Sequence, residues 1–240
     1  MDVVLVAGLW LGAAEWGAVA DALRRRGHRP VAVDLPGTGP GTGPGAADAA
    51  LDDQVAAVVA TVDAADRPVV VGHSAAATLA WLAADARPEA VRRVVLVGGF
   101  PSADGETYAD FFPVVDGGMP FPGWEPFEGA DAADLDAAAR DALAGRTTPV
   151  PERVARGVVR LRDPRRHAVP VTVVCPEFTP DDARAWVAAG DVPELAAAHD
   201  VTYVDLDSGH WPMVTRPEEL AALLDAAATG TAASGTPAGP

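Results

Sequence analysis

Hydrophobic residues fall into short continuous runs that alternate along the chain with longer, alanine-rich stretches. The runs that are almost entirely apolar lie near residues 2–7, 30–34, 68–72, 91–98, 169–175 and 201–206. A strand buried on both faces of a parallel sheet has this pattern, whereas a half-exposed strand alternates apolar and polar positions. We therefore predict strands in the interior of a sheet at these positions.

The stretches between the runs predict helices near residues 15–26, 47–65, 74–84, 181–189 and 217–228. Strands and helices that alternate in this order form a doubly wound, mostly parallel sheet of the α/β class. The chain has 240 residues, which is enough for one large domain with its own core.

The alternation stops after the fourth predicted strand, between residues 100 and 168. The first part of this insertion holds half of the chain's aromatic residues, and helical patterns follow near residues 130–143 and 151–161. Two compatible interpretations are a satellite core under long loops and a lid that gives an active site apolar walls. We therefore expect a core at 1–99 and 169–228, a lid at 100–168, and a disordered tail at 229–240.

Composition excludes several classes of function. The net charge of −16 argues against a general nucleic-acid binder, which needs a basic face. The single cysteine, Cys175, excludes an internal disulfide and a cysteine-cluster zinc site. No apolar run reaches membrane-spanning length and no signal-type segment precedes the first strand, so we expect a cytoplasmic protein without a membrane partner. The glycine-rich segment 36–45 lacks the Gly-Lys-Ser/Thr of a phosphate loop and predicts a flexible loop.

The pentapeptide Gly72-His73-Ser74-Ala75-Ala76 follows the third apolar run and leads into a helical stretch. A strand that turns sharply into a helix around Gly-x-Ser-x-small holds the serine hydroxyl above the sheet, in a nucleophile elbow. A serine that caps a helix N-terminus is the alternative. His210, which follows the last predicted strand, favours the elbow, because a serine needs a base and imidazole titrates near neutral pH.

On these residues the chain resembles the α/β-hydrolase family over residues 1–228. The run through Gly8-Leu9-Trp10 is similar to the family's first strand and oxyanion loop, and Asp34-Leu35-Pro36-Gly37 is similar to the turn after the next strand. The N-terminal third is most similar to small esterases related to plant methyl esterases and hydroxynitrile lyases.

The resemblance implies an oxyanion hole made by the backbone N–H groups of Leu9 and Ala75. Trp10 is the alternative second donor and a candidate wall of the pocket. His73 stands where the family has a residue that supports the elbow. The resemblance implies no metal and no organic cofactor.

The remaining histidines, His28, His167 and His199, stand at helix ends, in loops or before a strand, and we predict that they lie on the surface.

The acid of a catalytic triad is the least defined position. The family places an aspartate in the turn after the penultimate strand, where Thr179 stands in this chain. Glu177 lies two residues earlier, has a longer reach and is our leading candidate. Asp104, after the fourth strand, and Asp181, at the start of the next helix, are alternatives, as is a site without an acid.

The leading hypothesis is a serine hydrolase that cleaves a small, largely apolar ester, lactone or thioester through an acyl-enzyme on Ser74. His210 would transfer the protons, and Glu177 would orient the imidazole ring of His210. The irregular acid position and the aromatic lid also suit a non-hydrolytic lyase or cyclase of secondary metabolism, because one fold hosts many reactions. A third hypothesis is a protein that only binds a ligand. Each implies a small-molecule partner, and the oligomeric state stays open.

Overall fold

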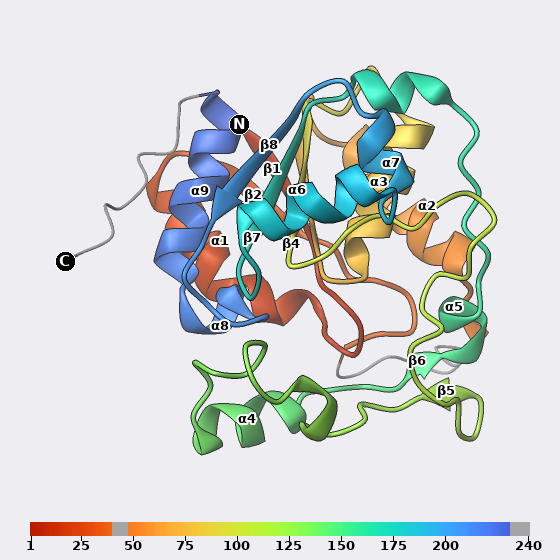
Figure 1. Ribbon diagram of the computed structural model, residues 1–240, viewed down its shortest axis with the longest axis vertical. Coiled ribbons are helices and arrows are strands. Elements are labelled where there is room, and N and C mark those ends of the chain that lie inside the picture. Colours follow the sequence, from red (N-terminus) through yellow and green to blue (C-terminus); the bar gives the residue numbers. More distant parts are fainter. Residues whose placement is uncertain (40–47, 231–240) are drawn as a thin grey trace.

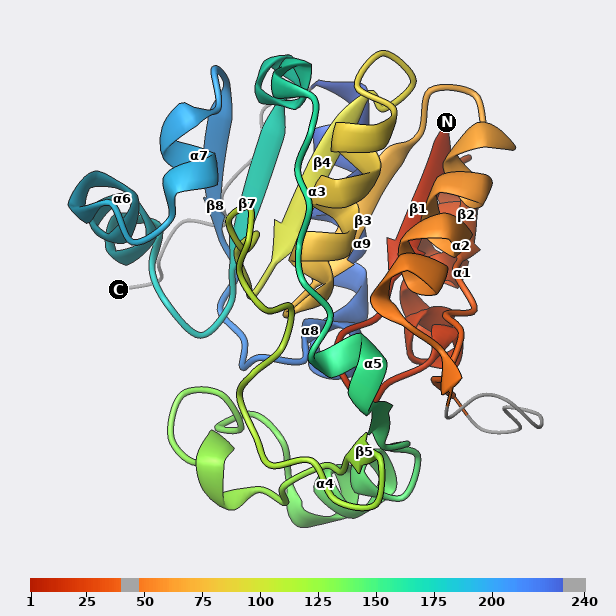
Figure 2. The ribbon, with the colours of Figure 1, turned by 90° about the vertical axis from the view of Figure 1, so that its right-hand side faces the viewer.

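A computed structural model describes residues 1–39 and 48–230. Its centre is a sheet of six parallel strands in the order β2-β1-β3-β4-β7-β8, with helices on both faces (Figures 1 and 2). The strands are β1 (Asp2–Val6), β2 (Arg29–Ala32), β3 (Val69–His73), β4 (Arg93–Val97), β7 (Val171–Cys175) and β8 (Val201–Asp205). The predicted doubly wound parallel sheet is confirmed.

The edges of the sheet differ from its centre. β1, β3 and β7 are buried throughout, and β4 is buried except at Arg93. All residues of β8, and all of β2 except the buried Pro30, are at least partly exposed, and Val31 is 48% exposed. The prediction of an interior position was therefore wrong for these two strands. Both are edge strands, with a neighbouring strand on one side only. The apolar content of a run does not predict whether its strand lies at the edge or in the centre of a sheet.

Each face of the sheet carries its own apolar cluster. α1 (Gly17–Arg25) and α9 (Pro217–Thr229) pack against one face, where Trp16 and Leu220 are fully buried. α2 (Leu51–Asp63) and α3 (Ala76–Ala86) pack against the other, where Trp81 and Leu79 are fully buried (Figure 2). The shorter elements of the core are η1 (Ala13–Trp16), α6 (Pro180–Ala189), α7 (Pro193–Ala197) and α8 (Pro212–Thr215).

Residues 100–168, here called the cap segment, connect β4 to β7 and lie largely beyond the carboxyl ends of the strands (green in Figure 2). Its elements are β5 (Gly118–Met119), η3 (Glu125–Phe127), α4 (Ala137–Ala144), β6 (Val150–Pro151), α5 (Glu152–Ala155) and η4 (Pro164–Ala168), and β5 pairs with β6 in antiparallel register. The division into core and lid stays a prediction.

The two helices predicted in the cap segment are shorter than expected. α4 begins only after Asp136, whose carboxylate accepts a hydrogen bond from the Ala139 N–H and caps the helix. α5 ends before Gly157, where a Cβ would lie 2.4 Å from the Leu51 Cβ, so the backbone passes too close to α2 for any larger residue.

Two predicted segments lie mostly beyond the described part of the chain. They are the disordered tail, of which residues 231–240 are outside, and the flexible loop at 36–45, of which residues 40–45 are outside. Among the described helices, none combines the length and the apolar character that crossing a membrane requires.

Candidate active site

Ser74 occupies a sharp turn between β3 and α3. Its φ of 55° lies in the left-handed region, and its N–H donates a hydrogen bond to the Val97 carbonyl at 2.8 Å. Only glycine fits beside this turn, because a Cβ at Gly72 would lie 2.2 Å from the Ala76 carbonyl oxygen and one at Gly99 would lie 2.4 Å from that of Ser74. The N-cap of α3 is Ala75 and not Ser74, so the helix-cap interpretation does not hold.

Three of the predicted site residues form one chain of hydrogen bonds. His210 Nε2 lies 2.9 Å from Ser74 Oγ, and His210 Nδ1 lies 2.6 Å from Glu177 Oε1. The side chains of His210 and Glu177 are 14% and 12% exposed, so both are largely shielded from water. The nucleophile, base and acid candidates therefore meet in the order that a triad requires.

The other acid candidates lie elsewhere. The carboxylate of Asp104 accepts a hydrogen bond from the Leu161 N–H at 2.8 Å. Asp181 is 94% exposed and pairs with Arg184 in the first turn of α6. Thr179 is the N-cap of α6. Its hydroxyl accepts a hydrogen bond from the Asp182 N–H and donates one to the Asp182 carboxylate. Of the three candidates only Glu177 contacts His210.

His73 holds the backbone of His210 in place. It is fully buried, and its Nε2 donates to the His210 carbonyl at 2.7 Å. Burial, together with the charge of a protonated His210, lowers the pKa of His73 from 6.5 to about 3, so the ring is neutral. The His73 ring leaves no room for a side chain at Gly8, because a Cβ there would lie 2.8 Å from His73 Nδ1.

The cap segment contacts the loop that carries His210. The His210 N–H donates to the Asp131 carbonyl at 2.8 Å, and Ser208 Oγ donates to Asp134 Oδ2 at 3.1 Å. Burial alone would raise the pKa of Asp134, but hydrogen bonds from Thr215, Gly209 and Ser208 outweigh it and hold that pKa below its usual range. No sequence pattern joins residues 131–134 to residues 208–210, and our sequence reasoning missed this contact.

The predicted oxyanion donors lie beside Ser74. Ala75 follows it directly, and the site of a Cβ on Gly8, the residue before Leu9, is 3.1 Å from Ser74 Cβ. Within residues 1–39 and 48–230, neither the Leu9 nor the Ala75 N–H is used in another hydrogen bond. Both groups are therefore available to an oxygen near Ser74.

Trp10 connects the loop after β1 to the cap segment. Its indole N–H donates to the Met119 carbonyl at 3.0 Å, and its own carbonyl accepts from the Thr148 N–H at 2.9 Å. Its ring packs against Phe112, Phe121 and Phe127, with centroids 5.7, 5.5 and 6.1 Å away. Trp10, Phe112, Phe121 and Phe127 thus form one aromatic cluster, here called the aromatic wall.

The aromatic wall continues to the candidate base. Trp124 and Phe127 of the cap segment lie 5.2 and 5.4 Å from the ring of Trp211, and Trp211 lies 4.9 Å from the ring of His210. The aromatic-rich part of the insertion thus packs as a small core that also contacts the residues beside the site.

The surface prediction was wrong for one histidine. His28 is only 7% exposed, and its Nε2 lies 2.8 Å from the Asp225 carboxylate on α9. His167 is half-buried beside Glu194, and His199 is exposed. His28 follows a helix-ending glycine, and the next strand brings it under α9, a contact across nearly the whole chain.

The described residues contain no cluster of three or more His, Cys, Asp or Glu side chains that would hold a metal ion. Cys175 is buried. Burial, and to a smaller extent the negative charge of the nearby Asp205, raise the pKa of its thiol to about 12. The thiol is therefore not a nucleophile, which leaves the hydroxyl of Ser74 as the nucleophile candidate of this site.

The comparisons with known proteins agree with this fold. The family model described as "Alpha/beta hydrolase family" matches residues 3–223. A sequence comparison with curated proteins finds no match. Among solved structures, an extracellular α/β-hydrolase from a Paenibacillus species is 17% identical, covers 93% of this chain and 97% of its own, and has a TM-score of 0.76. This Paenibacillus protein is described as sharing structural and functional homology with tobacco salicylic acid binding protein 2.

Two further structures are similar over nearly the whole chain. The methylesterase MES16 from Arabidopsis is 18% identical, with a TM-score of 0.73 and coverage of 96% of this chain and 99% of its own. The pyrethroid hydrolase PytH is 21% identical, with a TM-score of 0.72 and coverage of 95% and 97%. At these identities the likeness shows a shared fold. Because one of the three proteins is extracellular, a cytoplasmic location stays a prediction.

Proposed function

This chain belongs to the α/β-hydrolase family, and from that premise we propose that it is a serine esterase that cleaves small, largely apolar carboxylic esters through an acyl-enzyme on Ser74. The observation that carries the proposal is the continuous chain of hydrogen bonds from Glu177 through His210 to Ser74 Oγ. The esterases among the similar structures support the same class of reaction.

In the first half of the proposed reaction, His210 Nε2 takes the proton of Ser74 Oγ while that oxygen attacks the ester carbonyl carbon. The carbonyl oxygen becomes an oxyanion, which the N–H groups of Leu9 and Ala75 stabilise. Glu177 accepts the hydrogen bond of Nδ1–H, which fixes the ring orientation and stabilises the imidazolium. His210 then gives its proton to the departing alcohol.

In the second half, a water molecule takes the place of the alcohol. His210 accepts a proton from the water, the hydroxide attacks the acyl carbon, and the carboxylic acid leaves as Ser74 regains its proton. The same steps open a lactone or cleave a thioester.

The aromatic wall defines the proposed substrate class. Trp10, Phe112 and Phe121 offer apolar ring surfaces, and the cap segment that carries the two phenylalanines serves as the lid. Such walls gain free energy by burying apolar area, roughly 25 cal/mol per Å², and gain nothing from a charged group. We therefore expect preference for esters whose acyl and alcohol parts are both uncharged.

Labelling with a fluorophosphonate and turnover of nitrophenyl esters test the proposal together. The wild-type chain should be labelled once, on Ser74, and should hydrolyse the esters, whereas a folded Ser74→Ala variant should do neither. A folded wild-type chain that stays unlabelled would falsify the proposal. Labelling without ester turnover would favour a lyase or cyclase instead.

A further inference from the structure

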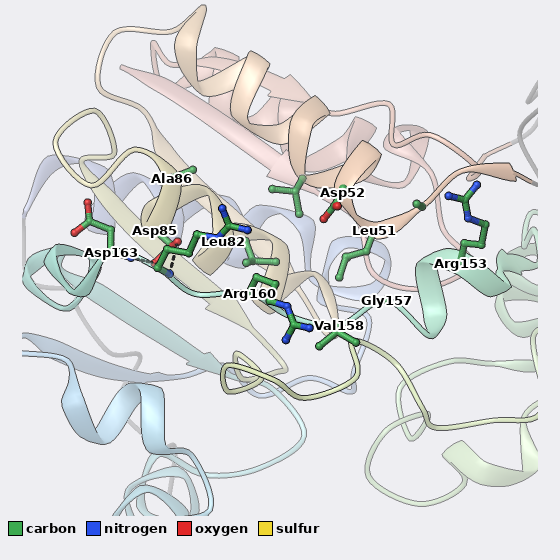
Figure 3. Close-up of a pocket in the computed structure, with 13 residues that line it drawn as sticks. Leu51, Asp52, Leu82, Asp85, Ala86, Arg153, Gly157, Val158, Arg160 and Asp163 are labelled. Carbon is green, nitrogen blue, oxygen red and sulfur yellow. Dashed lines mark hydrogen bonds between the residues drawn. The ribbon is translucent and has the colours of Figure 1, made fainter.

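A cavity of about 660 Å³ lies on the face of the sheet that α2 and α3 cover (Figure 3). None of Ser74, His210 and Glu177 lines it. Its size is within the range of small-molecule sites, roughly 300 to 1,000 Å³. It is bordered by the stretch 153–163, and six of the chain's 18 basic residues are arginines within residues 153–166.

The stretch after α5 presents alternate side chains to this cavity. Val158, Arg160 and Arg162 line it and are exposed, whereas Val159 is fully buried and Leu161 is partly buried. This period of two is that of an extended chain, and Val158 forms a β-bridge with Thr107. The two arginines therefore start about 6.6 Å apart on one side of the chain.

The backbone of this stretch is fixed by hydrogen bonds and close packing. Its Val159 N–H donates to the Glu106 carbonyl at 2.8 Å, and its Leu161 N–H donates to Asp104 at 2.8 Å. The carboxylate of Asp85, on α3, accepts from the Arg162 N–H at 2.9 Å. A ligand that binds both arginines therefore does not have to order the backbone that carries them.

The two guanidinium groups are free to bind an anion. In the described part of the chain, neither Arg160 nor Arg162 has a carboxylate partner. Among the described residues, Arg153, the third arginine of the lining, donates only to the carbonyl of Asp48, at 3.0 Å. The sequence has no acidic side chain at residues 40–47 and 231–240, which lie outside the described ranges.

The acidic residues of the lining are largely neutralised by other arginines. Asp85 pairs with Arg166 at 3.2 Å, and Asp163 pairs with Arg165 at 2.6 Å. Only Asp52 has no such partner among the described residues. Three cations thus face one unpaired carboxylate, in a chain whose net charge is −16.

The rest of the lining is apolar. Leu51 and Val55 come from α2, Leu82 comes from α3, and Val158 is 40% exposed beside them (Figure 3). A guanidinium group binds carboxylate and phosphate oxygens in pairs, and an apolar floor binds an apolar body. We propose that this cavity binds an amphiphilic anion, with its carboxylate or phosphate group on Arg160 and Arg162 and its apolar body against Leu51 and Leu82.

Ligand binding by the full chain tests this site without any need for catalysis, so its outcome is independent of the proposed esterase activity. The probes are 2-naphthoate, 2-naphthyl phosphate, the neutral 2-naphthol and the small anion acetate, titrated by fluorescence or calorimetry. We expect the two naphthyl anions to bind saturably, and the neutral and small probes to bind at least about tenfold more weakly. The tighter naphthyl anion identifies the preferred headgroup.

The variants distinguish binding in this cavity from binding at the candidate active site around Ser74. Arg160→Ala/Arg162→Ala should weaken the binding of both naphthyl anions by about tenfold or more. Its matched control, Arg67→Ala/Arg92→Ala, removes two exposed arginines outside the cavity and should bind like the wild type. Thermal unfolding verifies that both variants are folded. Equal binding by a folded Arg160→Ala/Arg162→Ala variant, or equal affinity for 2-naphthol, overturns the proposal.

Discussion

The carboxylate of Glu177 occupies the space that a side chain at Gly98 would take. A Cβ on Gly98 would stand 3.3 Å from Glu177 Oε2 and 3.3 Å from His210 Nδ1. β4 and β7 are neighbouring parallel strands, so the residue after each strand reaches the same edge of the sheet. Two positions far apart in the sequence therefore have access to the imidazole, and in this chain the proposed acid stands after the later strand.

This relationship predicts that the acid can be relocated. Glu177→Ala should lower kcat by about 10²- to 10⁴-fold, because His210 loses the group that orients it. Gly98→Asp added to Glu177→Ala should restore part of that loss, since aspartate tolerates the left-handed φ of 60° at this position better than most residues. Steady-state hydrolysis of a nitrophenyl ester measures both effects. Gly98→Ala/Glu177→Ala is the control, and the idea fails if it recovers as much activity as the aspartate variant.

His73 should make the protein less stable as the pH falls below 6.5. Its pKa is about 3 in the folded chain and 6.5 when unperturbed, so between these values the unfolded state binds the extra proton. The contribution to stability is complete above pH 6.5 and decreases toward pH 3, by up to about 1.4 kcal/mol per pH unit. Denaturant unfolding of the wild type and His73→Gln across this range isolates the effect, because the carboxylates titrate in both. Parallel curves for the two proteins would contradict the prediction.

Asp134 should position His210 from the cap segment. Its carboxylate accepts a hydrogen bond from the hydroxyl of Ser208, two residues before the base, so Asp134→Ala leaves that partly buried donor without this partner and loosens the loop. We expect kcat for a nitrophenyl ester to fall by about tenfold, since the loss of one such contact costs roughly 1–3 kcal/mol, with a smaller change in KM. Asp141→Ala, an exposed change in the same segment, should leave both constants unchanged. A change in KM without a change in kcat would mean that Asp134 affects substrate binding and does not position His210.

Two adjacent arginines should differ sharply in their effect on stability. Arg166 is buried and pairs with Asp85 and Glu194, and Glu194 also accepts from the Trp81 indole. Arg166→Ala leaves these carboxylates buried without their cation, so the free energy of unfolding should fall by about 3–5 kcal/mol. Arg165→Ala removes an exposed side chain that pairs with Glu89 and Asp163, and should cost about 0–1 kcal/mol. Similar denaturation midpoints for the two variants would show that the buried network does not stabilise the fold.

Sequence alone predicted the parts of the site that local chain geometry determines. The turn at Ser74 needs small neighbours at fixed spacing, and the order of strands places His210 after the last one, so both were accessible to pattern reasoning. The fold class followed from the alternation of apolar runs and helical stretches. Glu177 was the leading candidate because it stands two residues before the family's acid position and has a side chain long enough to make up the difference.

Contacts between distant segments could not be predicted in the same way. His28 is buried because Asp225 lies over it, and the sequence contains no signal that joins the two. The hydrogen bond between Ser208 and Asp134 also depends on how a long insertion folds back over the core. The exposure of β2 and β8 depends on strand order, which apolar content does not encode.

The two hydrogen bonds of Trp10 have a consequence for protein engineering. Its indole N–H and its carbonyl both bind backbone groups of the cap segment, at Met119 and Thr148, while the residue before it supplies a proposed oxyanion donor. A foreign cap grafted onto this core to change substrate range would have to present an acceptor and a donor at the same two places. Without them, a graft that improves ligand fit would disturb the oxyanion loop at the same time.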